Sequence, residues 1–356
     1  MIDKIKKIAP LIVALILLTV IFTACSSYDE NYAIYDIWVA GVKVTTRNQG
    51  DILGDGTVSY VGDGKSGTLT LNGANIEKSS DADADAFIIS TIDSLTVNLV
   101  GDNKIGMGEK APVNGISAFD LNIKGEGSLS IGARASCIKA DSLTVESGTI
   151  DTYIKTAVDE IASFIGVGLW AQELLLINGG DVRVHYAPAF TAISYGLYCV
   201  KDLTINGGSI EIKREDAAAL GIGIIASEKL TITDGNIEVY GNDDAMNAKR
   251  FEMSGGTVNA SAVDVIVLGF NPATGMPVFG SDGVCRLVNK AEFTGGSLTL
   301  TALERMNPDV PTFLSKDLTL DGMTVSGGET VDSLVERDAS SYTYTDTCIR
   351  IEKEVN

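Results

Sequence analysis

The stretch LTINGGSIEIKR, residues 203–214, has aliphatic residues at alternate positions on both sides of an Asn-Gly-Gly corner. A period of two is typical of a β-strand with one buried face. Glycine and asparagine tolerate positive φ, so the chain can turn sharply between two such strands. The same pattern recurs along the chain in LTVESGTIDTY (143–153), LLLINGGDVRVHY (174–186), LTITDGNIEVYG (230–241), FEMSGGTVNASA (251–262), AEFTGGSLTLTA (291–302) and LTLDGMTVSGG (318–328). The stretch is therefore one copy of a repeat.

The repeat has a period of about 28 residues between Leu69 and Leu318. One copy cannot bury its apolar face alone, so copies must stack, with each strand pairing in parallel with the same strand of the next copy. This pattern predicts an all-β protein, a right-handed parallel β-helix solenoid of about nine to ten coils. A hairpin-based sandwich or a propeller is the less favoured alternative, because no second turn recurs at hairpin spacing and propeller blades are longer.

The ends of a solenoid expose unpaired strands and need caps. The segment YAIYDIWVAGVKVT, residues 32–45, predicts an antiparallel cap with Trp38 in its core, and YTYTDTCIRIEKEV, residues 342–355, predicts the closing cap. The expected division of the chain is a signal peptide (1–24), a lipidated cysteine and tether (25–32), an amino-terminal cap (33–67), the β-helix (68–328) and a carboxyl-terminal cap (329–356). A short helix is expected within 154–166, and a projecting loop within 261–290.

The amino terminus has the form of an export signal, with three lysines before the apolar run LIVALILLTVIF. The run ends at FTAC, which resembles a bacterial lipobox with Cys25 as the lipidated residue, although Phe22 replaces the usual leucine. An uncleaved membrane anchor is the alternative. Removing residues 1–24 takes away three lysines and one aspartate, so the net charge changes from −20 to −22. We expect an extracytoplasmic monomer that contacts a membrane only through its lipid and does not bind nucleic acid.

The remaining cysteines show no metal-binding spacing. They are Cys137, Cys199, Cys285 and Cys348. Cys199 in GLYC occupies the position of Ala171 in GLWA one copy earlier, which predicts a small buried thiol. The sequence leaves their disulfide state open.

Outward residues of stacked copies form columns, one residue per copy. Alignment of GLWA, GLYC and GIIA places Trp170, Tyr198 and Ile225 in one column. Aromatic rings held by a rigid backbone can stack on the apolar face of a sugar ring. The next columns hold Asp151, Arg183, Glu211 and Glu238, then Tyr153, His185, Lys213 and Tyr240. The candidate ligand-binding residues are therefore Trp170, Tyr198, Arg183, Glu211 and Tyr240. Packing of the rings beneath a segment such as 154–166 is the alternative.

Two coils, GIGIIASEKLTITDGNIEVYG (221–241) and NDDAMNAKRFEMSGGTVNASA (242–262), resemble the extracellular carbohydrate-binding β-helix proteins of anaerobic bacteria. The segment YDIWVAGVKVT…LGDGTVSY resembles a module that precedes such coils in surface proteins of gut bacteria. The resemblance implies binding of plant-wall or acidic polysaccharide, with calcium at acidic coil corners. Asp243 and Asp244 match that corner, with Ala245 in place of its glycine, and are the candidate metal ligands.

A second acidic run, SSDADADAF at 79–87, alternates Asp81, Asp83 and Asp85 but lacks the glycine and distal glutamate of an EF-hand loop, so a solvated turn is the favoured interpretation. Three functions stay open: a surface lipoprotein that binds polysaccharide without cleaving it, a structural surface protein or adhesin, and a polysaccharide lyase. A lyase needs a group that removes a proton beside a uronate carboxyl, for which Lys213 or Arg183 are the candidates, without a supporting motif. The only histidine, His185, fits no hydrolytic arrangement, and no catalytic residue is assigned.

Overall fold

The protein is all-β. The computed structural model describes residues 32–78, 85–108, 112–155, 165–186, 194–214, 221–242, 244–263, 268–270, 277–278, 285–304, 312–315 and 317–353. Within these ranges, 26 strands form one mostly parallel sheet and two more form a small separate one. The only helix there is a 3-10 turn, η1 (Val331–Ser333). No helix in the described part of the chain has the length and hydropathy to cross a membrane.

The parallel pairings fall into three series, and each copy of the repeat between the terminal ones contributes one strand or part of a strand to each series. The A series comprises β6 (Ala86–Ser90) and β15 (Ser194–Cys199), the first parts of β9 (Asn114–Gly125), β11 (Ser136–Val145), β13 (Gly166–Ile177), β18 (Gly221–Ile232), β20 (Met246–Val263) and β23 (Cys285–Glu304), and β24 (Phe313–Ser315).

The B series continues along the same long strands after a change of direction. It comprises β4 (Ser66–Asn72), β7 (Ser94–Val100), later parts of β9, β11, β13, β18, β20 and β23, β16 (Asp202–Ile205) and β25 (Leu318–Leu320). The C series comprises β5 (Asn75–Ile76), β8 (Asp102–Ile105), β10 (Ser128–Ala133), β12 (Thr149–Ile154), β14 (Asp181–Tyr186), β17 (Ser209–Arg214), β19 (Asn236–Gly241) and the last parts of β20 and β23.

The predicted register of the stretch at 203–214 is confirmed. Leu203 and Ile205 on β16 pair in parallel with Leu175 and Ile177 on one side and with Leu230 and Ile232 on the other. Ile210 and Ile212 on β17 pair likewise with Val182 and Val184, and with Ile237 and Val239. All twelve side chains are buried. The two halves of the stretch belong to different series and are not a hairpin.

The corner between these halves needs its glycine. Gly208 has φ of 85°, and a Cβ there would lie 2.5 Å from the carbonyl oxygen of Gly180 in the preceding copy. Corners of successive copies stack at close range, so a side chain would meet the backbone of its neighbour. This contact explains why the Asn-Gly-Gly corner recurs.

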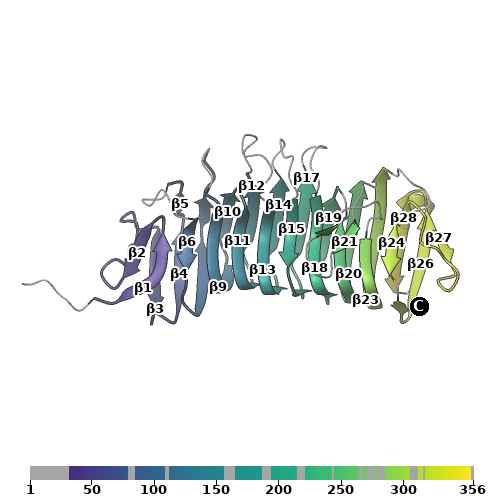
Figure 1. The fold of residues 1–356 in the computed structure, drawn as a ribbon, viewed down its shortest axis with the longest axis horizontal. Helices are drawn as coiled ribbons and strands as arrows, with labels where there is room; N and C mark the ends of the chain where they lie inside the picture. The colour runs from purple at the N-terminus through teal and green to yellow at the C-terminus, as the bar shows by residue number, and fades with distance from the viewer. Residues whose placement is uncertain are drawn as a thin grey trace, which may run out of the picture.

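Antiparallel strands cover both ends, as the sequence predicts. At the amino-terminal end, β1 (Ile34–Val39) pairs with β2 (Val42–Thr45) and with β6, and β3 (Val58–Gly62) pairs with β4. At the other end, β28 (Cys348–Lys353) lies between β23 and β26 (Met323–Gly328), which also pairs with β27 (Val335–Arg337). Figure 1 shows these caps at opposite ends of an elongated body.

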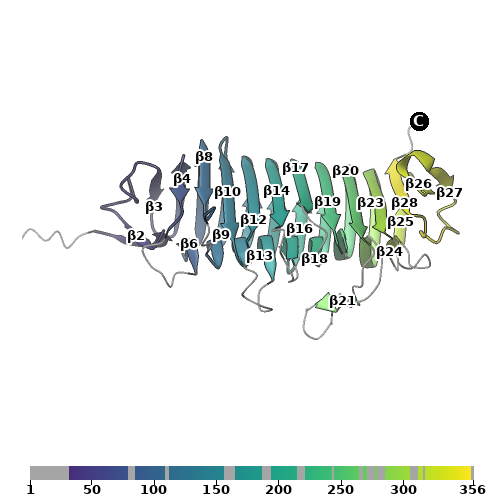
Figure 2. The ribbon, with the colours of Figure 1, turned by 90° about the horizontal axis from the view of Figure 1, so that it is seen from above.

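One insertion leaves the main body between β20 and β23. Its described parts, β21 (Leu268–Phe270) and β22 (Pro277–Val278), pair antiparallel in the separate small sheet, and Figure 2 shows β21 standing away from the body. This agrees with the projecting loop expected within 261–290. The signal peptide with Cys25, Asp81, Asp83 and most of the segment expected to be helical at 154–166 lie outside the described residues.

Candidate functional site

The A-series strands carry one continuous column of outward residues. Parallel register joins Ile89, Ser117, Lys139, Trp170, Tyr198, Ile225 and Asn247 in that order. Antiparallel pairing of β1 with β6 adds Trp38 beside Ile89. The predicted alignment of Trp170 with Tyr198 and Ile225 is therefore confirmed, and the column extends further toward the amino terminus than the sequence alignment covered.

A shallow groove of about 250 Å³ crosses four adjacent strands of this column, from β6 to β13. We call it the Trp170 groove. Its lining residues are Ile89, Ser90, Thr91, Ser117, Ala118, Phe119, Lys139, Ala140, Asp141 and Trp170. It thus combines aromatic surface with hydroxyl groups, one ammonium and one carboxylate, which is the mixture that a sugar ring requires.

Trp170 and Lys139 form the central pair of the groove. They are register partners on β13 and β11, and the Lys139 Nζ lies 5.0 Å from the centroid of the Trp170 ring. The attraction of an ammonium for an aromatic face is worth about 0.5–1 kcal/mol at an exposed site. Phe119, with 48% of its surface exposed, adds a second apolar face. A bound ligand must compete with Lys139 for the face of Trp170.

Tyr198 has a different environment from Trp170. Its ring lies 5.3 Å from that of Tyr195 at a tilt of 57°. Burial raises the pKa of its hydroxyl. Tyr198 and Trp170 both pack on a small cluster, separate from the main core, that consists of Val167, Tyr195, Ile222 and Ile225. Tyr198 is half-buried, as Trp170 is, but it does not line the groove, so its use as a stacking surface stays a prediction.

Ile225 is buried, unlike the two aromatic residues before it in the column. It follows Tyr198 in the outward column, yet none of its surface is exposed. The apolar cluster covers it from outside the main core. Of the three aligned outward residues, only Trp170 lines the groove.

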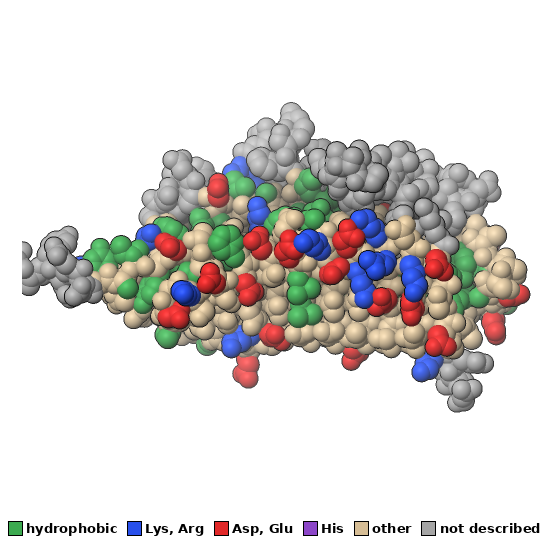
Figure 3. All heavy atoms as spheres, turned by 60° about the horizontal axis from the view of Figure 1, so that its bottom comes forward, with side chains coloured by type: hydrophobic (Ala, Val, Ile, Leu, Met, Phe, Trp, Pro, Cys, Tyr) green, Lys and Arg blue, Asp and Glu red, His purple; other side chains and the backbone are tan. Residues whose placement is uncertain are grey.

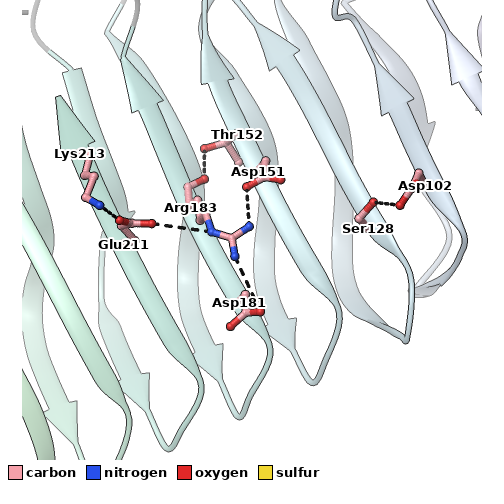
Figure 4. Close-up of polar contacts among 8 residues, drawn as sticks. All are labelled: Asp102, Ser128, Asp151, Thr152, Asp181, Arg183, Glu211 and Lys213. Carbon is pink, nitrogen blue, oxygen red and sulfur yellow. Dashed lines mark hydrogen bonds and ion pairs between the residues drawn. The ribbon is translucent and has the colours of Figure 1, made fainter. Parts of the chain in front are cut away.

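The C series carries a network of charges rather than an aromatic groove. Figure 4 shows Arg183 on β14 between acidic residues of three strands. Its guanidinium lies 3.2 Å from Asp151, 4.0 Å from Asp181 and 3.7 Å from Glu211, and Lys213 forms a further ion pair with Glu211. Arg183 and Lys213, the two basic groups considered for a lyase, thus both form ion pairs with carboxylates. Partly exposed pairs of this kind contribute about 0–1 kcal/mol each to stability.

An aromatic pair lies beside this network. The rings of Tyr153 and His185, register partners on β12 and β14, stack at 4.6 Å with 9° between their planes. The predicted columns are thereby confirmed for Asp151, Arg183, Glu211 and Glu238 and for Tyr153, His185 and Lys213. Tyr240, on β19, donates a hydrogen bond to Asn242 at 3.0 Å.

The structure does not bring the five predicted ligand-binding residues into one site. Trp170 and Tyr198 belong to the A series, whereas Arg183, Glu211 and Tyr240 belong to the C series. The chain runs from one series to the other through the B part of β13 and the corner before β14. The five residues are thus divided between two series, and their joint role in ligand binding stays a prediction.

Basic and acidic side chains alternate over the surface instead of forming a patch of one sign. Figure 3 shows them interspersed along one side of the body. Ion pairs account for this: Lys201 with Glu173, Lys229 with Glu252 and Lys249 with Glu228 join successive copies, and Lys290 with Glu292 lies within β23. The large negative charge is therefore spread rather than concentrated in one site.

The corner with the candidate metal ligands Asp243 and Asp244 shows few of the oxygen ligands that a metal ion needs among its described residues. Asp243 lies outside the described residues, and the carboxylate of the buried Asp244 accepts a hydrogen bond of 3.0 Å from the Asn247 amide. In the ranges that the structure describes, no three His, Cys, Asp or Glu side chains gather to hold a metal ion. The described residues at this corner do not by themselves make a calcium site.

Three of the four remaining cysteines are buried free thiols, namely Cys137, Cys199 and Cys348. Burial raises the pKa of Cys137 to about 12 and that of Cys199 to about 11. The prediction that Cys199 is a small buried thiol is confirmed.

Sequence reasoning missed Lys139 and Phe119. Extending the alignment of GLWA two copies backward would have placed Ser117 of ISAF and Lys139 of IKAD in the column of Trp170. The alignment could not have identified Phe119, because this residue follows Ala118, the last position of the aligned segment. Trp38, expected in the cap core, is instead a half-buried outward residue with Lys43 over its ring.

The family model of carbohydrate-binding domain-containing proteins matches residues 42–264. The chain belongs to this family. The matched segment contains every residue that lines the Trp170 groove. No curated protein matches the chain, and no solved structure does.

Proposed function

We propose that the protein is a cell-surface lipoprotein that binds polysaccharide, of plant-wall or acidic type, without cleaving it. The observation that carries this proposal is the Trp170 groove, in which Trp170, Phe119 and Lys139 lie together on rigid paired strands. Membership of a carbohydrate-binding family supports the ligand class.

The chemistry of the groove suits a sugar. The C–H face of a pyranose is apolar and can stack on Trp170 or Phe119, while its hydroxyl groups can bond with Thr91, Ser117 and Asp141 at the groove edge. A carboxylate on the sugar would also attract Lys139 away from the Trp170 ring. A neutral sugar would have to displace the Lys139 ammonium from the Trp170 ring without gaining an ion pair in return. Acidic glycans are therefore the favoured class of ligand.

The fold that presents this groove is, in our proposal, a right-handed parallel β-helix with the caps and boundaries predicted from the sequence. Three series of parallel pairings at a spacing of one repeat support it. We further propose that Cys25 carries the lipid, so that the body extends from the membrane with its amino-terminal cap nearest the anchor. Calcium at Asp243 and Asp244 stays a prediction.

Retention of the soluble fragment 26–356 on a panel of immobilised polysaccharides tests the proposal, with wild type compared to Trp170→Ala. The wild type should be retained on one class of glycan, and the variant should be retained about fivefold more weakly. Tyr240→Ala is the matched control, since it removes a half-buried aromatic ring from the C series. Loss of retention in the control but not in Trp170→Ala would move the site to the C series.

The same immobilised polysaccharides also test whether the protein cleaves its ligand and whether binding requires calcium. Reducing ends and unsaturated uronate absorbance should not increase during incubation, and their appearance would show an enzyme. Repeating the retention with calcium and with chelator tests the metal prediction. No retention on any glycan would leave the structural or adhesin alternative.

A further inference from the structure

The groove column carries two tryptophans, each with a lysine over its ring. The Lys139 Nζ lies 5.0 Å from the Trp170 ring centroid, and the Lys43 Nζ lies 4.4 Å from that of Trp38. Each lysine is the register partner of its tryptophan on the neighbouring strand. Both rings are half-buried, and the Lys43 ammonium also forms an ion pair of 3.4 Å with Asp36.

The two rings are four strands apart in the same outward column. The order is Trp38, Ile89, Ser117, Lys139 and Trp170. Neighbouring strands are about 4.8 Å apart, so the rings are separated by about 19 Å along the stacking direction. The three residues between them are smaller or, in Lys139, flexible. The Trp170 groove occupies most of this interval, from β6 to β13.

We propose that the ligand is an extended glycan chain that lies parallel to the long axis of the molecule and stacks on Trp170 and Trp38 with sugars about four residues apart. The strand spacing of about 4.8 Å is close to the length that one sugar adds to an extended chain, so successive sugars stay in step with successive strands. A glycan that coils cannot keep this alignment. The inference rests on the proposed function, because it concerns the same groove.

This arrangement makes affinity depend on chain length. A disaccharide reaches one ring, whereas about a pentasaccharide is needed to reach both. The second contact is then intramolecular and requires no further loss of translational freedom. Affinity should therefore rise until about the pentasaccharide and then level off.

Titration calorimetry of the detergent-solubilised full chain tests the inference. The probes are oligogalacturonides and cello-oligosaccharides from disaccharide to octasaccharide, as extended acidic and neutral chains, with malto-oligosaccharides as chains that coil. Wild type should prefer one of the extended series and show the plateau at about five sugars. Trp38→Ala should lower pentasaccharide affinity about fivefold to tenfold and disaccharide affinity by much less.

The control variant is Trp38→Tyr, which keeps an aromatic ring at the same register position and should retain most of the gain with length. Melting temperatures of both variants show whether the cap is intact. If Trp38→Ala does not fold, the wild-type length series decides alone. A plateau at a trisaccharide or shorter, equal loss at every length in Trp38→Ala, or tighter binding of malto-oligosaccharides overturns the inference and leaves the proposed function standing. Absence of binding to all three series overturns both.

Discussion

Lys139 and Trp170 are partners in parallel register on adjacent strands, and the ammonium of one lies over the ring of the other. Thirty-one residues of sequence separate them, including a complete turn through the B and C series. The pair therefore exists only because copies of the repeat stack. It also gives the groove a charge that can move when a ligand arrives.

Replacing Trp170 and Tyr198 one at a time should separate binding from packing. Trp170→Ala should weaken glycan binding by about 1 kcal/mol, or several-fold, because it removes a stacking face. Tyr198→Ala should lower the melting temperature, because it leaves a hole beside Tyr195. Calorimetric titration and thermal melting measure the two effects. Equal loss of binding with unchanged stability in Tyr198→Ala would contradict this division.

Lys139→Met should reveal the charge of the ligand. It keeps the aliphatic stem over Trp170 but removes the ammonium, so affinity for a uronate glycan should fall by about 1 kcal/mol and become less sensitive to salt. Affinity for a neutral glycan should stay the same or rise. Lys124→Met, an exposed lysine on the B part of β9, is the control. Similar losses for acidic and neutral glycans would count against a role for the charge.

Gly208→Ala should destabilise the fold by about 2 kcal/mol or more, because the new Cβ combines positive φ with a contact of 2.5 Å to the Gly180 carbonyl oxygen. Gly50→Ala is the matched control, since a Cβ at Gly50 has no heavy atom within 4 Å. Chemical denaturation of both variants measures the difference. A Gly208→Ala protein as stable as the control would show that the corners stack less closely than described.

The buried thiols should make stability fall at high pH. The pKa values of Cys137 and Cys199 are about 12 and about 11, above the ordinary value of 9.0. Above pH 9 the unfolded chain loses these protons while the folded chain keeps them, so each thiol lowers the unfolding free energy by about 1.4 kcal/mol per pH unit until the folded pKa is reached. Denaturation between pH 9 and pH 11 measures this slope.

Cys137→Ala removes one of the two thiols, so the fall of the unfolding free energy with pH should be smaller by about 1.4 kcal/mol per pH unit. In the native protein both thiols should resist iodoacetamide, and mass spectrometry should find them alkylated only after denaturation. Rapid labelling of Cys137 in the folded protein would contradict its complete burial.

Cys25→Ser should abolish lipidation and release the protein from membranes or leave the precursor uncleaved. Membrane fractionation and mass analysis of the amino terminus measure the outcome. A processed amino terminus with unchanged membrane retention would rule out the lipobox interpretation and favour another mode of attachment.

The repeat, its register and both caps could be predicted from the sequence, because they depend on local rules. Alternation of apolar residues decides which side chains of Leu203 to Ile212 are buried, and the glycine corners decide where each strand ends. Since one copy cannot bury its own face, the period alone required the copies to stack in parallel.

The candidate site depended on the tertiary structure. The sequence placed Trp170, Tyr198 and Ile225 in one outward column. Only the folded chain shows that Ile225 is buried in an apolar cluster on which both rings pack, and that Trp170 alone of the three lines a groove with Phe119 and Lys139. It also separates Arg183, Glu211 and Tyr240 onto another series of strands. An alternating pattern distinguishes inward from outward side chains within one strand. Exposure of an outward side chain is decided by residues from other copies and other series, which only the stacking brings together.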